Sequence, residues 1–403
     1  MYNLEKLYYI DQYIKEFTAE IEEIIEKDNK FHVVLDKTAF FPGGGGQPCD
    51  LGFIEEHEVL ETYEDEGNIY HVVSKKPIKI HKVKCKIDWN RRFDYMQQHL
   101  AQHTLSGCFF KLFNHNTAGI HLGKEVSTID IVGEVTENQI REAELYANKM
   151  INENLKVEFL FPEKRELKKM GLRRALPKTN EKIRVVKIED LDINACCGVH
   201  PSRTIELQVI KLGRFEKHKG NTRIEFLAGN RAVNDYFKKD SFTKNICNFL
   251  SCNEEEAINS ISNLNNQLKD ANNKNKALAL EVSEYKSKEL IANSYKVNDI
   301  SIIKEIYENE DVKYISKIAN RLTEMDKVIA LIAIKNDDRV NLIFASSKNI
   351  KNVDMNNLLK DSISLIDGRG GGNKFLAQGG GKNNSNLDSL LDYAFKKVKD
   401  SIQ

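Results

Sequence analysis

The first 88 residues alternate between apolar and polar positions in short runs that turn residues separate. The run "FHVVLDK", residues 31–37, is typical of a half-buried strand, because side chains of a strand point to opposite faces in turn. Runs of this length are too short for helices. We therefore predict a small β-barrel or a strongly bent sheet over residues 1–88.

A glycine-rich stretch, "TAFFPGGGGQPCDLG" at residues 38–52, interrupts these strands. Four consecutive glycines between Pro42 and Pro48 fit neither a helix nor the interior of a strand, because glycine loses the most backbone entropy in either. The stretch is predicted to be a loop. Its role has two interpretations: a wide connection between strands, or a loop that faces a ligand.

Residues 91–113 repeat with the period of a helix. Met96, His99, His103, Ser106 and Phe110 share one face at that period, and the segment has no proline. The strand pattern "STIDIVG" follows, and then a second helix that opens with Thr136 and Gln139 in capping-box spacing. A further strand, "KVEFLF", completes a mixed α+β domain whose helices cover one side of a sheet.

A seam of heptads runs from Ala257 to Tyr285, with Asn275 at one seam position. A buried asparagine there fixes the register of a coiled coil at a cost in stability. The seam has two candidate partners: another helix of the same chain, or the same helix of a second copy in a homodimer.

Two buried-type strands, "KVIALIAIK" and "RVNLIFASS", lie beyond residue 297 among helical patterns, and a second glycine block follows at residues 367–382. The predicted fold class is thus α+β. Its parts are an N-terminal small β-barrel (1–88), a central α+β domain (89–240), a helical coiled-coil segment (241–296) and a small C-terminal α/β domain (297–403).

The composition narrows the functional classes. The chain has 60 basic and 60 acidic residues, so no overall field attracts nucleic acid, and any contact with a polyanion must come from local patches. The N-terminus lacks a signal-peptide pattern and no stretch of about 18 apolar residues occurs, so we expect a cytoplasmic protein without a membrane span. Seven cysteines favour free thiols or metal ligands over a disulfide framework.

Two short-spaced pairs suggest a metal site. His99 and His103 lie one helical turn apart, and Cys196 and His200 have the same spacing in a later loop. Chance alone gives roughly 0.25 pairs of the first kind and roughly 0.17 of the second in this composition. Both together are expected at about 4%, and three imidazoles with one thiolate form a ligand set for Zn²⁺.

These residues stand in a wider pattern of motifs. The stretches "RRFDYMQQHLAQHTLSGCF" and "ACCGVH", with "FFPGGGGQPCDLG" upstream and "NTRIEFLAGNRA" downstream, closely resemble the editing half of alanyl-tRNA synthetases and the freestanding editing proteins of the AlaX type. The final "GRGGGNKFLAQGGG" resembles the C-terminal domain of the long forms. The resemblance covers nearly the whole chain, with the motifs in the family's order.

The resemblance implies a trans-editing hydrolase in which residues 89–240 form the editing domain. It would cleave the ester of Ser-tRNA(Ala), Gly-tRNA(Ala) or both, with one Zn²⁺ per chain. The implied zinc ligands are His99, His103, Cys196 and His200. A zinc-containing protein that binds tRNA without catalysis is the alternative, and turnover at enzyme far below substrate separates the two.

The motifs also depart from the family pattern. The family commonly has Thr after the first His and Leu after the second, whereas this chain has Leu100 and Thr104. Cys197 and Val199 replace Gly and Thr between the second pair of ligands, and Gly43 stands where Glu often precedes three glycines. The family motif therefore does not identify the residue that reads a serine hydroxyl in this chain.

We predict that Thr104, or else Gln98, supplies the catalytic contact to a serine hydroxyl, because both are polar neighbours of the histidines. A helical Thr more often bonds to its own backbone, which would leave it no part in the reaction.

Contacts to tRNA are expected from local features. The basic runs 164–174 and 211–223 could follow phosphates, although a solvated helix face is the usual meaning of such a run. The two glycine blocks add a backbone that can approach RNA closely. The predicted tRNA-binding residues are Gly43, Gly44, Gly45, Gly46, Gln47, Arg369, Gly370, Gly371, Gly372, Lys374, Gln378, Gly379, Gly380 and Gly381.

Overall fold

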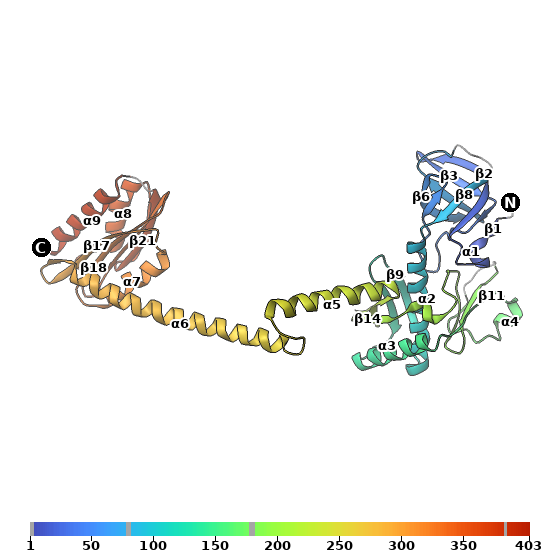
Figure 1. Cartoon of the computed structure of the whole chain (residues 1–403). Coiled ribbons are helices and arrows are strands. Elements are labelled where there is room, and N and C mark those ends of the chain that lie inside the picture. The colour runs from blue at the N-terminus through green and yellow to red at the C-terminus, as the bar shows by residue number, and fades with distance from the viewer. Residues whose placement is uncertain (1–3, 78–81, 177–181, 383–384) are drawn as a thin grey trace. The chain divides into compact units, whose positions relative to one another are not determined.

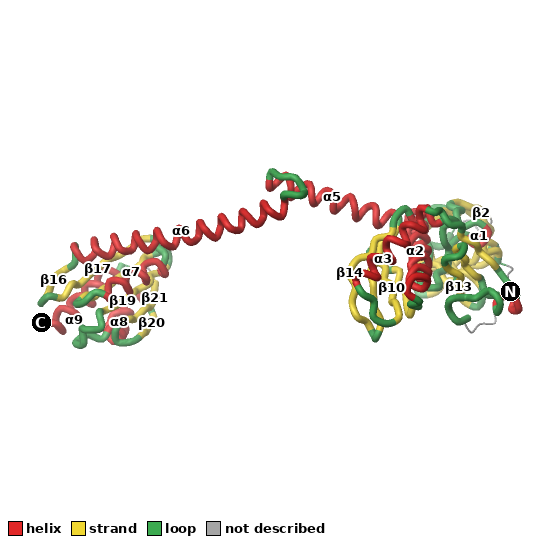
Figure 2. Tube along the Cα trace, turned by 90° about the horizontal axis from the view of Figure 1, so that it is seen from below, coloured by secondary structure: helices red, strands yellow, loops and turns green. Residues whose placement is uncertain are grey.

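The chain folds into two compact units, Met1–Phe249 and Leu250–Gln403, in a computed structural model (Figure 1). The structure describes residues 4–77, 82–176, 182–382 and 385–403. Both helices and sheets are present in each unit, so the predicted α+β class is confirmed (Figure 2). No helix in the described ranges is long and apolar enough to cross a membrane.

The N-terminal strands form a closed barrel in the order β2-β3-β7-β6-β5-β8, since β8 pairs with both β5 and β2. Alternate side chains such as Val33, Leu35 and Val73 fill the core between them. The strands are β2 (Glu16–Lys27), β3 (Lys30–Leu35), β5 (Gly52–Ile54), β6 (His57–Asp65), β7 (Asn68–Val73) and β8 (Lys82–Ile87).

Three short elements join this part to the rest of the unit. They are β1 (Glu5–Lys6), α1 (Leu7–Ile10) and β4 (Lys37–Thr38), and β1 pairs with β4 in parallel. The glycine stretch predicted to be a loop lies between β4 and β5, and all four glycines at 43–46 have positive φ. That prediction is confirmed, and only glycine adopts such a run of angles readily.

The helix predicted over residues 91–113 is α2 (Trp89–Phe113). The Asp88 carboxylate accepts from the Arg91 N–H at 3.1 Å and starts the helix, and Asn114 ends it in the left-handed conformation. The predicted capping box of Thr136 and Gln139 is also present, at the start of α3 (Glu137–Asn152). Helix α3 therefore begins where the sequence indicated, and α2 begins two residues before the predicted start at residue 91.

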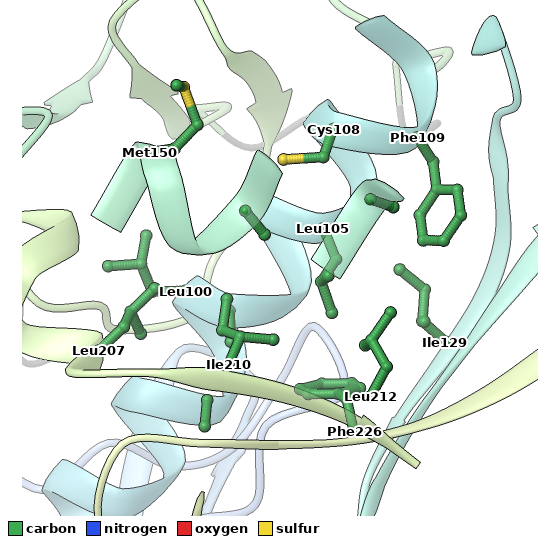
Figure 3. Close-up of a cluster of buried hydrophobic side chains, with 14 of the residues drawn as sticks. Leu100, Leu105, Cys108, Phe109, Ile129, Met150, Leu207, Ile210, Leu212 and Phe226 are labelled. Carbon is green, nitrogen blue, oxygen red and sulfur yellow. The ribbon is translucent and has the colours of Figure 1, made fainter. Parts of the chain in front are cut away.

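Helices α2 and α3 pack on a four-stranded sheet with the order β14-β15-β10-β9. Figure 3 shows the shared core, to which Leu105 and Phe109 of α2, Met150 of α3 and Phe226 of β15 all contribute. The strands are β9 (Thr117–Leu122), β10 (Ser127–Val132), β14 (Ile210–His218) and β15 (Asn221–Ala228). Because this face of α2 is buried against the sheet, another face of the helix points toward the site described below.

A second, three-stranded sheet carries the Cys196–His200 segment at its end. Its order is β11-β12-β13, all antiparallel, and the strand predicted from "KVEFLF" is β11. The elements are β11 (Val157–Leu160), α4 (Lys164–Leu167), β12 (Val185–Ile188), β13 (Asp192–Ala195), the 3₁₀ helix η1 (Thr204–Leu207) and α5 (Asn230–Leu250).

The second unit is a six-stranded sheet with the order β16-β17-β18-β19-β21-β20. Helix α7 joins the parallel strands β17 and β18, and α8 and α9 cover the opposite face from α7 (Figure 1). The elements are α6 (Ala257–Ala292), β16 (Tyr295–Val297), β17 (Ile300–Glu308), α7 (Val312–Glu324), β18 (Val328–Lys335), β19 (Arg339–Ser346), α8 (Met355–Ile363), η2 (Ser364–Ile366), β20 (Arg369–Gly372), β21 (Leu376–Lys382) and α9 (Leu387–Ile402).

The heptad segment forms one long helix, α6, but the coiled coil is not confirmed. Seam side chains such as Leu264, Leu268 and Leu278 are exposed among the described residues. The part of α6 that packs does so through a different stripe, Ser283 and Leu290 near its end. The predicted pairing therefore has no partner within the described chain.

The C-terminal glycine block is a β-hairpin of β20 and β21, where the sequence indicated no strand. A Cβ at Gly370 would meet the backbone of Gly379, and one at Gly381 would meet Ile366. These glycines are thus needed for close packing of α8 and η2 on the hairpin, and not only for contact with RNA.

The N-terminal barrel buries the imidazole of His71 on β7. Its Nδ1 donates to the Val33 carbonyl at 2.9 Å, and its Nε2 lies 2.9 Å from the Thr38 hydroxyl, which acts as donor. Burial lowers the pKa of His71 to about 4. The folded protein therefore holds this ring neutral.

A stability prediction follows from His71. Between pH 6.5 and about 4 the unfolded chain binds a proton that the folded chain does not, so the unfolding free energy should fall by roughly 3 kcal/mol as pH drops through this window. Above pH 6.5 this residue should have no effect. Urea unfolding followed by the fluorescence of Trp89, the single tryptophan, measures it. His71→Gln should flatten the pH dependence, whereas His121→Gln, at an exposed position, should not.

Candidate metal centre

Two parts of the chain meet to form a cluster of four potential metal ligands. His99 and His103 lie on α2, and Cys196 and His200 lie in the loop after β13. Their ligand atoms all lie within 4.8 Å of one another; the Cys196 Sγ is 3.4 Å from the His99 Nε2 and 3.7 Å from the His200 Nε2. The structure thus brings together every ligand that the sequence suggested.

His99 is oriented by the glycine-rich loop. Its Nδ1 donates to the Gln47 Oε1 at 3.0 Å, and the same oxygen accepts from the Val199 N–H at 3.0 Å. A proton at Nδ1 leaves the Nε2 lone pair directed at the cluster. Gly198 makes room for this arrangement, since a Cβ there would collide with the His99 ring.

His103 is oriented by a carboxylate on β13. Its Nδ1 donates to the Asp192 Oδ2 at 2.9 Å, and Arg173 Nε donates to the other oxygen of Asp192 at 2.7 Å. All three side chains are at least 96% buried. His200 differs from the other two imidazoles, because its buried Nδ1 has no hydrogen-bond partner among the described residues.

The electrostatics of the cluster hold Cys196 as a thiolate, the form that binds a metal ion. Burial alone would raise the pKa of the Cys196 thiol, but His99 and His200 lower it well below its usual value. Burial lowers the pKa of His103, and the Asp192 carboxylate and the nearby Cys196 thiolate raise it more, to about 9. Burial raises the pKa of Asp192, but His103 and Arg173 bring that pKa below its usual value. Cys196 and Asp192 are thus both held in their negatively charged forms.

The glycine-rich loop lies directly over the ligands. A Cβ on Gly45 would come within 3.7 Å of the His99 ring and 3.8 Å of the Cys196 sulfur. Gly44 and Gly45 also face the Cys197 sulfur, which would be 3.1 and 3.2 Å from added Cβ atoms. The interpretation of this stretch as a ligand-facing loop is therefore favoured over a plain connection.

Most departures from the family motif have a structural reason. Leu100 is fully buried in the core between α2 and the sheet, so it does not reach the ligands' side of the helix. Val199 is buried against Tyr8, Phe41 and Met96, a site in which a methyl group packs well. Only its backbone N–H takes part in the site.

The two predicted catalytic residues make structural hydrogen bonds. The Thr104 hydroxyl donates to the Leu100 carbonyl at 2.9 Å, and Gln98 pairs with the backbone of Ala228 through both ends of its amide. Both side chains are buried. The geometry thus gives no support to a catalytic role for either, because their polar groups already hold α2 together and join it to β15.

The predicted tRNA-binding residues fall into two groups. In the first group Gly45 and Gln47 lie at the cluster and Gly44 faces the Cys197 sulfur, whereas Gly43 and Gly46 face Cys49 and Ile120. Arg369 and Lys374 are exposed on the hairpin of the second unit, where Gln378 donates to Ser316 at 3.1 Å. No role was predicted for Asp192 or Arg184, and Arg173 was placed only in a basic run that could follow phosphates, whereas it is buried against Asp192. Asp192 stands at the start of β13, four residues before Cys196, and this spacing is a signal that could have found it.

Arg184 fixes the segment that carries Cys196. Its Nη1 donates to the carbonyls of Cys196 at 3.1 Å and Gly198 at 2.7 Å. Its guanidinium also lies over the rings of Tyr9 and Phe159, at 4.9 and 4.6 Å. The Cys196–His200 loop is thus held from both sides.

The donor set fits a metal ion. Two of the imidazoles carry an outer hydrogen bond that fixes the tautomer, as metal-bound histidines usually do. The His103 Nε2 is buried without a partner among the described residues, which is costly unless a ligand satisfies it. These four residues could therefore hold one ion.

Comparison with known proteins agrees with this arrangement. Three family models match the chain: the threonyl and alanyl tRNA synthetase second additional domain at residues 183–225, the class II (A) tRNA synthetases at residues 5–91, and the DHHA1 domain at residues 295–400. The chain is 33% identical to the alanyl-tRNA editing protein AlaX-L of Pyrococcus horikoshii, over 99% of this chain and all of the relative. It belongs to the alanyl-tRNA editing proteins.

Other relatives of this editing protein cover less of one chain or the other. The alanyl-tRNA editing protein Aarsd1 of Mus musculus is 34% identical over 64% of this chain and 67% of its own. The alanine–tRNA ligase of Methanobrevibacter smithii is 29% identical over 97% of this chain, which spans only 45% of the ligase. A solved structure, the C-Ala domain from Aquifex aeolicus alanyl-tRNA synthetase, aligns with 27% of this chain at 25% identity and a TM-score of 0.24.

The hydrogen bond to His103 generates a prediction for this editing protein. Asp192→Asn should weaken metal binding by about 10- to 100-fold, because the amide is a poorer acceptor and no longer fixes the His103 tautomer. Competition with a chelator of known affinity measures the change. The control is Asp130→Asn, which removes a carboxylate paired with Arg223 on the sheet. Equal affinities in wild type and Asp192→Asn would exclude this role.

Proposed function

We propose that the chain is a trans-editing deacylase that removes serine, glycine or both from tRNA(Ala). The observation that carries the proposal is the buried cluster of His99, His103, Cys196 and His200 beneath the glycine loop. It occurs in a chain that matches an alanyl-tRNA editing protein over its full length. We place the activity in the cytoplasm, where tRNA is charged.

The physical need for such an enzyme is clear. A synthetase pocket built for alanine gains or loses only about 1–3 kcal/mol with one methylene or one hydroxyl, so it cannot exclude glycine or serine well enough. A second, hydrolytic site corrects these errors. An aminoacyl ester is already activated, so the site needs mainly a positioned water and donors for the developing oxyanion.

We infer that the cluster holds one Zn²⁺ per chain, because one thiolate and three imidazoles are a zinc ligand set. Four protein ligands leave no open position, so zinc would shape the pocket, or it would polarise the ester carbonyl if His200 gave up its place. We favour the first role. In either case Gln47 and Asp192 keep the protons of His99 and His103 at Nδ1.

The protein's own residues can position the substrate. Gly44 and Gly45 present bare backbone above the ligands, so the ester can approach closely without meeting a side chain. Cys197 is exposed at the same place and leaves a route for water. Buried groups around the cluster limit competing solvent, which strengthens hydrogen bonds to the reacting ester.

We propose that the C-terminal segment, residues 297–403, binds the body of the tRNA. Arg369 and Lys374 on the glycine hairpin offer exposed cations there. We further propose that the exposed seam of α6 pairs with a second copy of the chain, since a continuous apolar stripe on a long helix is otherwise costly in water. The alternative function is a zinc-containing tRNA-binding protein without catalysis.

The central prediction is selective deacylation. The wild type should hydrolyse Ser-tRNA(Ala) or Gly-tRNA(Ala) with many turnovers and leave Ala-tRNA(Ala) largely intact, and Cys196→Ala should lose both zinc and activity. Thr104→Val should keep the wild-type selectivity, because the hydroxyl is used by the Leu100 carbonyl. Release of labelled amino acid measures deacylation by the wild type and both variants, and elemental analysis measures their zinc content. Equal rates on the three charged tRNAs would end the editing proposal, and stoichiometric binding without turnover would favour the alternative.

The division of labour between the units gives another prediction. A chain ending at Phe249 keeps all four ligands and should still deacylate, but it should bind tRNA more weakly and with a shallower dependence on salt. It should also sediment as a monomer, whereas the full chain should be a dimer. Arg369→Gln in the full chain should reduce the salt slope by about one without changing sedimentation. Equal tRNA affinity and equal salt slope for the full chain and the chain ending at Phe249 would contradict tRNA binding by the C-terminal segment. A monomeric full chain would contradict pairing through α6.

A further inference from the structure

Beside the metal cluster, the first unit has a hollow that the proposed function does not use. Its volume is about 450 Å³, which is in the range of small-ligand sites. Phe161 forms one wall, with its side chain 52% exposed. Lys164, Arg165 and Lys182 line the same hollow.

The lining suits a single nucleotide. Three cations face one acidic residue, Glu163, so the hollow is positive in a chain that is neutral overall. An exposed aromatic ring among cations is the usual platform for unpaired nucleic acid, because every base can stack on the ring while the cations meet phosphate. A hollow of this size admits one base, and it is too small for a duplex.

A continuous set of contacts joins the hollow to the cluster. Phe161 packs edge-on against Tyr9, with ring centroids 6.1 Å apart, and the Tyr9 hydroxyl donates to the Cys197 carbonyl at 2.7 Å. Cys197 directly follows the ligand Cys196. A second route runs from Tyr9 to the Arg184 guanidinium, on to Phe159 and from there to the His200 ring, at 6.2 Å from Phe159. Tyr9 thus links Phe161 in the hollow to Cys197, the residue next to the candidate ligand Cys196.

We propose that this hollow binds an unpaired nucleotide at the 3′ end of the substrate tRNA, next to the aminoacyl ester. The base stacks on Phe161, and Lys164, Arg165 and Lys182 hold the phosphate. The proposal rests on the editing function, because the ester must reach the cluster while the adjoining chain lies close by. The basic run at residues 164–174 thereby gains a specific role at its N-terminal end.

The test uses the full-length, metal-loaded protein and three substitutions in the hollow. Phe161→Ala should raise the KM for mischarged tRNA about tenfold or more and leave kcat within about twofold, because stacking is lost while the cluster is intact. Phe161→Trp should restore the wild-type KM. Arg165→Gln should lower the slope of log affinity against log salt by about 0.7.

Matched controls come from the N-terminal barrel. Phe53→Ala and Lys86→Gln remove an exposed ring and an exposed cation from β5 and β8, and they should leave KM unchanged. The direct probes are a labelled single-stranded ACCA oligonucleotide and a duplex stem without unpaired ends. Phe161→Ala should weaken binding of the oligonucleotide and not of the duplex.

The outcomes separate this proposal from the editing function. Wild-type affinity of Phe161→Ala for the oligonucleotide, or equal losses for oligonucleotide and duplex, would overturn the nucleotide site even if editing is confirmed. If the wild type deacylates nothing but Phe161→Ala still loses oligonucleotide binding, the nucleotide site stands and the editing function fails.

Discussion

The side-chain amide oxygen of Gln47, Oε1, is the atom on which the site depends. It accepts from the His99 imidazole and from the Val199 backbone at 3.0 Å each, so one atom joins the glycine loop, helix α2 and the Cys196–His200 loop. These segments lie far apart in the sequence, and each is fixed by its own core. A buried carboxylate supports the same junction: Asp50, just beyond the loop, forms an ion pair with Arg92 on α2 and accepts from the Phe41 N–H at 2.7 Å. Removing one partner of such a buried pair is costly, so the loop has little freedom to leave the helix.

The three imidazoles of the cluster are not equivalent. His99 and His103 each have an outer hydrogen bond that sets the proton and the ring orientation, and both rings come from a single rigid helix. His200 stacks on Phe159 but has no such bond among the described residues. Because outer hydrogen bonds raise ligand basicity, His200 is the weakest of the three donors. The site is thus built to hold an ion firmly through α2 and less firmly through the loop.

Local patterns of the sequence predicted the helices and most strands well. The capping signal at Thr136, the alternation in β10 and the apolar runs of β18 and β19 depend only on neighbouring residues, and each appears where expected. The glycine hairpin of β20 and β21 was missed because glycine disfavours strands in isolation. It is stabilised there by close packing of α8 and η2, a tertiary effect that a local pattern does not contain.

The same distinction applies to the candidate site. The four-residue spacing of His99 with His103 and of Cys196 with His200 predicted the candidate ligands. Residues so close in the sequence also lie close in space. Their hydrogen-bond partners come from sequence-distant positions such as Gln47 and Asp192, so spacing could not reveal them. Thr104 and Gln98 were chosen for adjacency to the histidines, yet a helix turns adjacent residues about 100° apart, toward the core and toward β15. Four-residue spacing therefore identified candidate ligands on one face of α2. Direct adjacency in sequence was a poor guide to catalytic residues, because neighbouring residues of a helix point to different faces.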